Sequence, residues 1–167
     1  DLAGGSHYSD ATEISGDGTV IAGNSESTLG RQGFVWTADT GMVGMGFLSD
    51  SSPYFSEVRG LSGDGAIAVG PSAYRDGSPY WDRDNGATWT ASEGIQPLPF
   101  GSQEEERFID VRGVSLDGRT IVGRGRNNAS SSFQSIPYMW TADGGFEQFP
   151  LAGADTHSTF VDISDAG

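Results

Sequence analysis

The chain has 167 residues, and its 23 carboxylate side chains outnumber nine basic ones, all arginine, giving a formal net charge of −14. Such an acidic excess argues against nucleic acid as a partner, because binding phosphates needs clustered positive charge. The absence of cysteine excludes disulfides and thiolate chemistry. No segment approaches the roughly 20 apolar residues of a membrane helix, so membrane insertion is not expected.

Two sequence blocks recur along the chain. The first is an apolar residue followed by Ser-x-Asp-Gly, and its copies begin at residues 14, 61 and 114, with a frayed fourth copy at 163. These starts lie 47, 53 and 49 residues apart. Internal repetition of this length is typical of arrays whose units stack on one another. We therefore expect a single repeat array over 1–167, with units at 7–52, 53–104 and 105–154 and the start of a fourth at 155–167.

In each unit the first predicted strand carries two apolar residues three positions apart, for example Val58 with Leu61 and Val111 with Val114. A spacing of three breaks the period of two expected in a strand. Gly60 and Gly113 lie between these residues, and a β-bulge there would return both side chains to one face.

The Asp-Gly pair that follows predicts a tight turn into a second strand. The second strands, 20–23, 67–70 and 120–123, are almost wholly apolar, as expected for strands covered on both faces. Polar segments of variable length come next, at 24–32, 71–86 and 124–136.

The second recurring block joins Trp-Thr-Ala to a glycine, and it predicts the corner between the third and fourth strands. Its tryptophans are expected to be core residues and its glycines turn residues: Trp36 with Gly41, Trp89 with Gly94, and Trp140 with Gly145. Proline falls in the fourth strand, where it cannot donate to a sheet ladder. The fourth strand should therefore be the outer edge of each unit.

Four antiparallel strands per unit describe the blade of a β-propeller. We thus expect an all-β, β-propeller-like array of three four-stranded blades plus an extra strand. A β-solenoid is the alternative fold, although solenoid coils are usually shorter.

The combination of S-x-D-G-x-x-I-x-G, W-T-A-x-x-G and Leu-Ala-Gly-Gly-Ser at 2–6 resembles the HAF repeat family of predicted extracellular bacterial proteins, which often carry PEP-CTERM sorting signals or autotransporter domains. The likeness covers essentially the whole chain, but the His-Ala-Phe that names the family is replaced, for example by 32–34 Gln-Gly-Phe. The resemblance implies secretion and a propeller-like fold. It implies no established activity.

The aspartates of the turns, Asp17, Asp64 and Asp117, have two interpretations. In an acidic secreted protein they are weak calcium candidates, because Ca²⁺ prefers carboxylate and carbonyl oxygens in loops. A calcium loop usually gathers several carboxylates, whereas here one aspartate recurs per unit beside its glycine. The structural turn is therefore the favoured interpretation, with no cofactor expected and calcium left possible.

The longest insertion, 72–86, has no counterpart in the other units, and its aromatic and charged residues suit a sugar or peptide site. The candidate ligand-binding residues are Tyr74, Tyr80, Trp81, Arg83 and Asp84. Aromatic residues also commonly pin a long loop to its own sheet. A glycan-binding or other ligand-binding module is accordingly the alternative function.

Catalysis is not expected. The two histidines, His7 and His157, occupy different positions of the repeat, so a nucleophilic triad has no anchor. The sequence instead favours a noncatalytic, secreted structural or adhesive protein at the cell surface or outside the cell. Its expected partners are further repeats or copies of itself, because the first strand of the fourth unit would leave an edge open for pairing.

Overall fold

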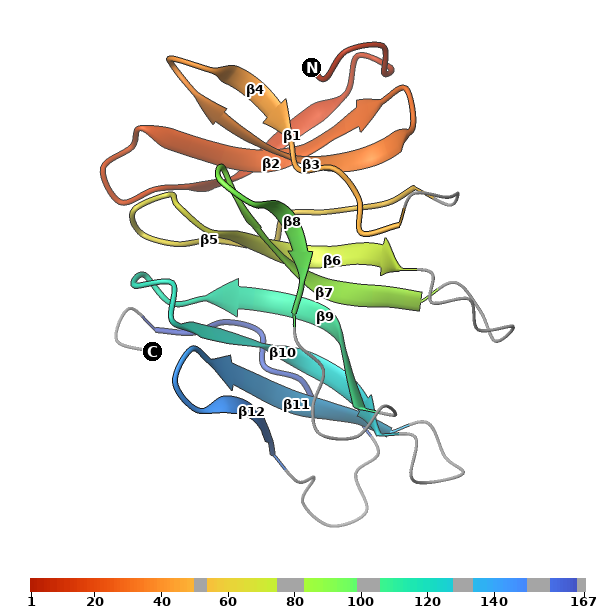
Figure 1. The fold of residues 1–167 in the computed structure, drawn as a ribbon, viewed down its shortest axis with the longest axis vertical. Coiled ribbons are helices and arrows are strands. Elements are labelled where there is room, and N and C mark those ends of the chain that lie inside the picture. Colours follow the sequence, from red (N-terminus) through yellow and green to blue (C-terminus); the bar gives the residue numbers. More distant parts are fainter. Residues whose placement is uncertain (50–53, 75–82, 99–105, 128–133, 150–156, 165–167) are drawn as a thin grey trace.

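The computed structural model describes residues 1–49, 54–74, 83–98, 106–127, 134–149 and 157–164. Every regular element in these residues is a β-strand, and the strands form three four-stranded antiparallel sheets, one above another in Figure 1. The first sheet holds β1 (Ser9–Ile14), β2 (Val20–Ser27), β3 (Gly30–Thr37) and β4 (Gly41–Gly44). The second holds β5 (Gly60–Leu61), β6 (Ala68–Tyr74), β7 (Arg83–Thr90) and β8 (Gly94–Pro97). The third holds β9 (Glu106–Val114), β10 (Thr120–Asn127), β11 (Gln134–Thr141) and β12 (Gly145–Gln148).

Each sheet takes its four strands in sequence order from one repeat. This confirms the prediction of an all-β chain with four antiparallel strands per repeat. The fourth strands β4, β8 and β12 lie at sheet edges, as the prolines indicated, and Pro97 closes β8. A β-solenoid would pair strands of successive repeats within shared sheets, and the described strands do not pair in that way. None of the described segments forms a helix that could cross a membrane.

The second and third strands are longer than the sequence predicted. β2 and β3 extend through most of 24–32, which we expected to be a variable polar segment, and pair without interruption from Val20–Thr37 to Ser27–Gly30. Polar residues remain in the strand because the neighbouring sheet supplies partners: the buried Asn24 accepts a hydrogen bond at Oδ1 from the backbone N–H of Val58, 2.8 Å away.

The predicted bulge in the first strand is confirmed. The register of β1 with β2 shifts between Ala11 and Glu13. The register of β9 with β10 shifts where Val111 pairs with Gly123 while Gly113 pairs with Val122. At each of these shifts one residue, Thr12 or Arg112, is left outside the ladder, and β9 has a second shift between Asp110 and Phe108. Val111 and Val114 both reach one core cluster, and Val58 and Leu61 both reach the other.

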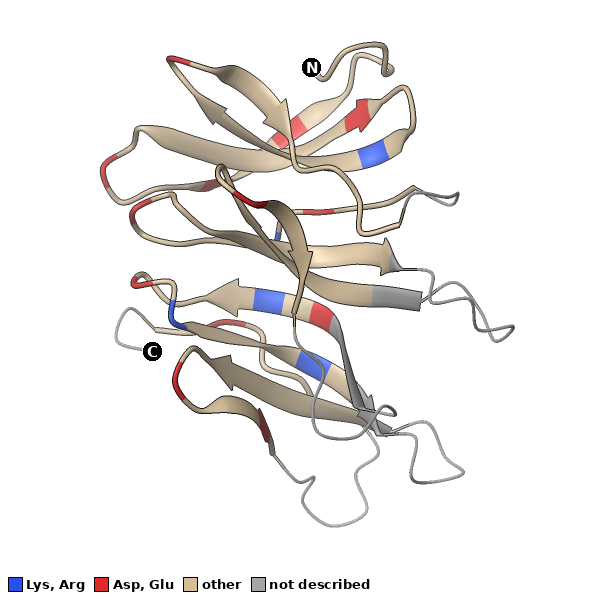
Figure 2. Ribbon diagram, in the orientation of Figure 1, with Lys and Arg blue, Asp and Glu red and all other residues tan. Residues whose placement is uncertain are grey.

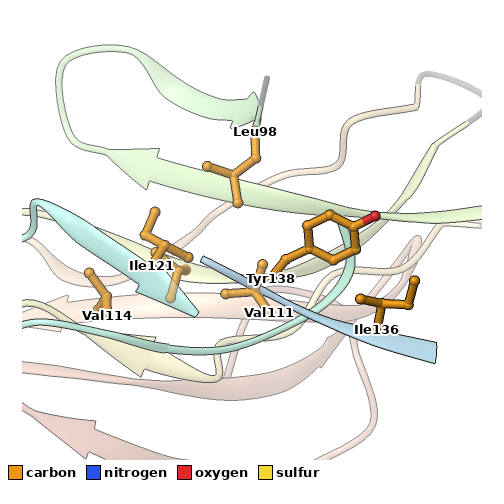
Figure 3. Packing of buried hydrophobic residues seen from close by; sticks show 7 residues of the cluster. Leu98, Val111, Val114, Ile121, Ile136 and Tyr138 are labelled. Atoms are coloured by element: carbon orange, nitrogen blue, oxygen red, sulfur yellow. The ribbon is translucent and has the colours of Figure 1, made fainter. Parts of the chain in front are cut away.

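The core consists of two clusters, one in each space between adjacent sheets. Between the first and second sheets lie the buried residues Ala22, Val35, Met45, Val58, Leu61, Ala68 and Trp89. Between the second and third sheets lie Val69, Leu98, Val111, Val114, Ile121, Ile136 and Tyr138 (Figure 3). The second sheet contributes to both clusters, so both of its faces are covered.

Candidate functional site

The Ser-x-Asp-Gly block folds into the same closed turn in all three sheets. In the second sheet the Ser62 hydroxyl donates to Asp64 Oδ1 at 2.7 Å and accepts from the backbone N–H of Ile67 at 2.9 Å. Asp64 Oδ1 also accepts from the backbone N–H of Ala66. Gly65 supplies the positive φ, +71°, that ends the turn. Ser15 with Asp17 and Ser115 with Asp117 repeat the arrangement.

These turns are hydrogen-bonded to one another across the sheets. The backbone N–H of Gly16 donates to the carbonyl of Gly63, and the N–H of Gly63 donates to the carbonyl of Leu116. The donor–acceptor distance is 2.8 Å in both hydrogen bonds. These three residues occupy the same position of the repeat, and Gly63 is both a donor and an acceptor. Identical backbone groups therefore form a continuous stack along one edge of the molecule, independently of side-chain identity.

The aspartates of the turns are engaged in holding them. Hydrogen bonds from the backbone N–H of Thr19, from the Ser15 hydroxyl and from the Thr19 hydroxyl lower the pKa of Asp17. The serine hydroxyl and one backbone N–H of the turn likewise lower the pKa of Asp64 and of Asp117. The described residues contain no group of three or more His, Asp or Glu side chains placed to hold a metal ion. The geometry at these calcium candidates is that of a hydrogen-bonded structural turn.

A row of alternating charges joins the first two sheets. The Glu57 side chain, 15% exposed, accepts from Arg31 Nε of β3 at 2.9 Å and lies 2.7 Å from Arg59 Nη2. Arg31 also lies 3.6 Å from Asp10 of β1. Because Glu57 and Arg59 directly precede β5, the pair Arg31–Glu57 links one sheet to the next.

The row continues into the third sheet, where Asp110 of β9 is surrounded by three guanidinium groups. Its side chain is 11% exposed and lies 2.7 Å from Arg112 Nη2, 2.9 Å from Arg124 Nε and 3.7 Å from Arg59 Nη1. Figure 2 shows the basic segments of β9 and β10 beside the acidic segment of β9. The row thus ends with surplus positive charge at the third sheet and with Asp10 at the first.

The start of the fourth repeat, 157–164, occupies the equivalent place beside the third sheet. The backbone N–H of Ser158 donates to the carbonyl of Ser135 in β11, just as the N–H of Ser56 donates to the carbonyl of Arg31 in β3. Phe160 packs edge-on against Phe149, with ring centroids 5.1 Å apart. This segment therefore continues the relation between adjacent repeats.

Two carboxylates of the first and fourth repeats lie within electrostatic reach of each other. Burial, and secondarily the charge of Asp162, raise the pKa of Glu13. The second and third repeats have glycine at the same position, and a Cβ atom built on Gly113 would be 3.6 Å from Asp162 Oδ1. The first strands of the three sheets and the segment 157–164 therefore follow one edge of the molecule, where two glycines leave room between the carboxylates.

The Trp-Thr-Ala block lies at the corner between the third and fourth strands. Trp89 is buried in the first core cluster, Trp140 packs against the second, and Trp36 is partly exposed. Their partner glycines have positive φ: Gly41 +68°, Gly94 +70° and Gly145 +71°. The threonine closes the corner by accepting a backbone hydrogen bond, as Thr37 does from Thr40 at 3.1 Å.

The candidate ligand-binding residues fall at the end of the hairpin β6–β7. Tyr80 and Trp81 lie outside the described residues. For the other three only the backbone is described: Tyr74 pairs with Arg83, and Asp84 pairs with Ala73. The hairpin therefore brings the backbone of these three residues together.

Asn85 follows in β7 and is 1% exposed, and its side-chain oxygen and nitrogen make no hydrogen bond. Buried polar atoms without partners are uncommon, because they lose their hydrogen bonds to water without replacement.

His7 lies 3.5 Å from Asp1 on the surface, and His157 forms a bridge with Ser135, so the two histidines are placed in different repeats.

Sequence reasoning did not identify the serines of the turns, the corner threonines or the charge row as structural contacts. The serine and threonine positions recur in every repeat and gave a usable signal. The charge row gave a weaker one, because an acid recurs five residues before the turn serine at positions 10, 57 and 110, but its arginine partners come from different strands.

No protein-family model matches the chain, and no curated protein matches it in sequence. The likeness to the HAF repeat family accordingly stays a hypothesis based on the repeat motifs alone.

Proposed function

We propose that this chain is a noncatalytic structural or adhesive repeat protein that acts outside the cell as part of a larger array. The observation that carries the proposal is the stack of turns, in which Gly16, Gly63 and Leu116 are joined by backbone hydrogen bonds. The recurring geometry of the turn is used for contact between sheets. Such an arrangement provides a rigid body in which the outer face of an end sheet carries the same kinds of residues as the faces that contact one another inside the array.

We further propose a β-propeller-like arrangement of the sheets. The electrostatic interaction of Glu13 with Asp162 supports it, because these residues belong to the first and fourth repeats. Repeats that wind about a common axis bring their inner strands together in this way, with the fourth strands outermost.

A ligand-binding module using 72–86 is the second candidate. The specific observation in its favour is the buried Asn85 amide, whose donor and acceptor have no partner at the base of that insertion. Directed amide hydrogen bonds beside aromatic side chains are typical of glycan sites.

Electron microscopy of the purified chain together with a glycan array separates the two candidates. Regular assemblies without glycan binding support the structural role. Glycan binding that is lost in Trp81→Ala, with unchanged circular dichroism, supports the ligand-binding module and contradicts the structural proposal. If the chain forms no regular assemblies and binds no glycan, the behaviour expected of the structural role is missing, and this result counts against that role.

A further inference from the structure

An apolar row crosses all four strands of each sheet on one face. In the second sheet, cross-strand pairing aligns Leu61, Ala68, Trp89 and Ile95; in the third, Val114, Ile121, Trp140 and Phe146; and in the first, Ile14, Ile21, Trp36 and Met42. The rows of the second and third sheets belong to the core clusters that contact the preceding sheet. The row of the first sheet, called here the head row, faces no other sheet in the part of the chain that the structure describes.

Exposure shows the difference between these equivalent positions. Leu61 and Val114 are 8% and 9% exposed, whereas Ile14 is 63% exposed. At the second-strand position Ala68 and Ile121 are 0% and 1% exposed, whereas Ile21 is only half-buried. The head row therefore has the shape and composition of a surface that, elsewhere in this molecule, is covered by a sheet of the same kind.

Charge also differs between the two ends of the array. Glu57 and Asp110 each receive a guanidinium group from the preceding repeat, Arg31 and Arg59 respectively. Among the described residues, Asp10 has only Arg31 of its own repeat, at 3.6 Å, and its Oδ1 atom has no hydrogen-bond partner. Arg112, the repeat equivalent of Arg59, lies at the opposite end.

We infer that the head row is a docking surface for the third sheet of a second copy of this chain. The inference rests on the proposed structural role and names its contact. In this head-to-tail contact, β1 takes the place that 157–164 occupies in the structure, and Arg112 of the second copy reaches Asp10 as Arg59 reaches Asp110. The segment 157–164 forms no strand of the third sheet, and Val161 is 74% exposed. Its described contacts with that repeat include the bridge of His157 with Ser135, the backbone hydrogen bond from Ser158 to Ser135 and the packing of Phe160 on Phe149, so a fully paired strand can replace it.

Replacing 157–164 by β1 of another copy is favourable because β1 belongs to a complete four-stranded sheet, which makes more contacts than a single segment. Covering the head row removes apolar side chains from water, and supplying Asp10 with a guanidinium group completes the charge row. Continuation of the turn stack would add a backbone hydrogen bond to Gly16. A closed ring of two chains and an open polymer use the same contact.

The test is the size of the full chain in solution, measured by light scattering over a range of protein and salt concentrations. We expect a dimer or larger species whose dissociation constant rises about tenfold or more in Ile14→Glu. Leu29, which is 55% exposed in the β2–β3 turn, provides the matched control, and Leu29→Glu should leave the dissociation constant unchanged. Asp10→Asn should weaken association and reduce its salt dependence, because one ion pair is lost.

Two further variants address the tail. Phe160→Ala loosens the packing on Phe149 and should tighten association, whereas Val161→Ala should not change it. Assembly that is unaffected by Ile14→Glu would overturn the head row while leaving the structural role intact. Weaker association of Phe160→Ala would overturn the exchange with 157–164. A strictly monomeric wild-type chain would overturn the docking surface, and microscopy would then decide the structural role separately.

Discussion

At the scale of single residues, one serine per repeat determines the turn. Ser62 is 1% exposed and acts at once as donor to Asp64 and as acceptor from Ile67. Its hydroxyl thus satisfies a backbone N–H that the closed turn hides from water. The same double role at Ser15 and Ser115 explains why this position does not vary among the three complete repeats.

Replacing this serine should be costly. We expect Ser62→Ala to lower the free energy of unfolding by about 1–3 kcal/mol, because the N–H of Ile67 loses its partner and Asp64 loses a donor. Urea denaturation followed by tryptophan fluorescence measures the change. Ser6→Ala, at an exposed position, should be neutral within about 0.5 kcal/mol. Equal stability of Ser62→Ala and wild type would contradict the role of the hydroxyl.

The chain should lose stability in acid because of the aspartates in its turns. Hydrogen bonds to Asp17, Asp64 and Asp117 lower the pKa of each carboxyl in the folded state. A lowered folded-state pKa stabilises the protein above the unfolded pKa, and this stability is lost as the pH falls through the folded pKa. We expect the urea midpoint of the wild-type chain to fall between about pH 5 and pH 2.

The matched variant replaces all three aspartates by asparagine, which keeps the acceptor oxygen but removes the charge. Its urea midpoint should be lower than that of the wild type at pH 7 and should change less over the acidic range. Asp39→Asn, in an exposed corner, should retain the wild-type pH profile. A triple variant with the wild-type pH dependence would show that other carboxyl groups cause the acid sensitivity.

At the scale of strands and sheets, the sequence predicted the number, order and edges of the strands because turns and prolines act locally. It missed the length of β2 and β3, because Asn24 is tolerated in a strand only through its contact with Val58 of the next sheet. It also missed the charge row, since Arg31 and Glu57 are 26 residues apart and no local pattern joins them. The sequence could not predict where the candidate ligand-binding residues of 72–86 lie, because this insertion has no equivalent in the other repeats with which to compare it.

The charge row should contribute to contact between sheets. Arg59 lies close to Glu57 at the start of the second sheet and to Asp110 of the third. We expect Arg59→Met to destabilise the chain by about 1–3 kcal/mol, between the values for exposed and buried pairs, since it leaves two poorly solvated carboxylates with fewer partners. Arg119→Met is the control, because the Arg119–Asp143 pair is solvent-exposed. Similar effects of the two substitutions in urea denaturation would refute the linking role of Arg59.

At the scale of the whole molecule, contact runs from each sheet to its neighbour. The first cluster joins the first and second sheets, and the second cluster joins the second and third. A molecule built from nearest-neighbour contacts opens from its ends, because an end sheet loses one interface and the middle sheet must lose two. The second sheet is therefore expected to be the most persistent part of the array.

Hydrogen exchange of two equivalent variants tests this arrangement. Val58 and Val111 hold the same position in the repeat and are 1% and 0% exposed, but Val58 packs between the first and second sheets and Val111 between the second and third. Val58→Ala should accelerate exchange mainly in β2 and β3, and Val111→Ala mainly in β10 and β11, because each cavity weakens one interface by about 1–2 kcal/mol. Each variant is the control for the other, since the chemical change is identical. Acceleration spread evenly over all three sheets in both variants would mean that the array unfolds as one cooperative unit, and the interfaces would then not be separable.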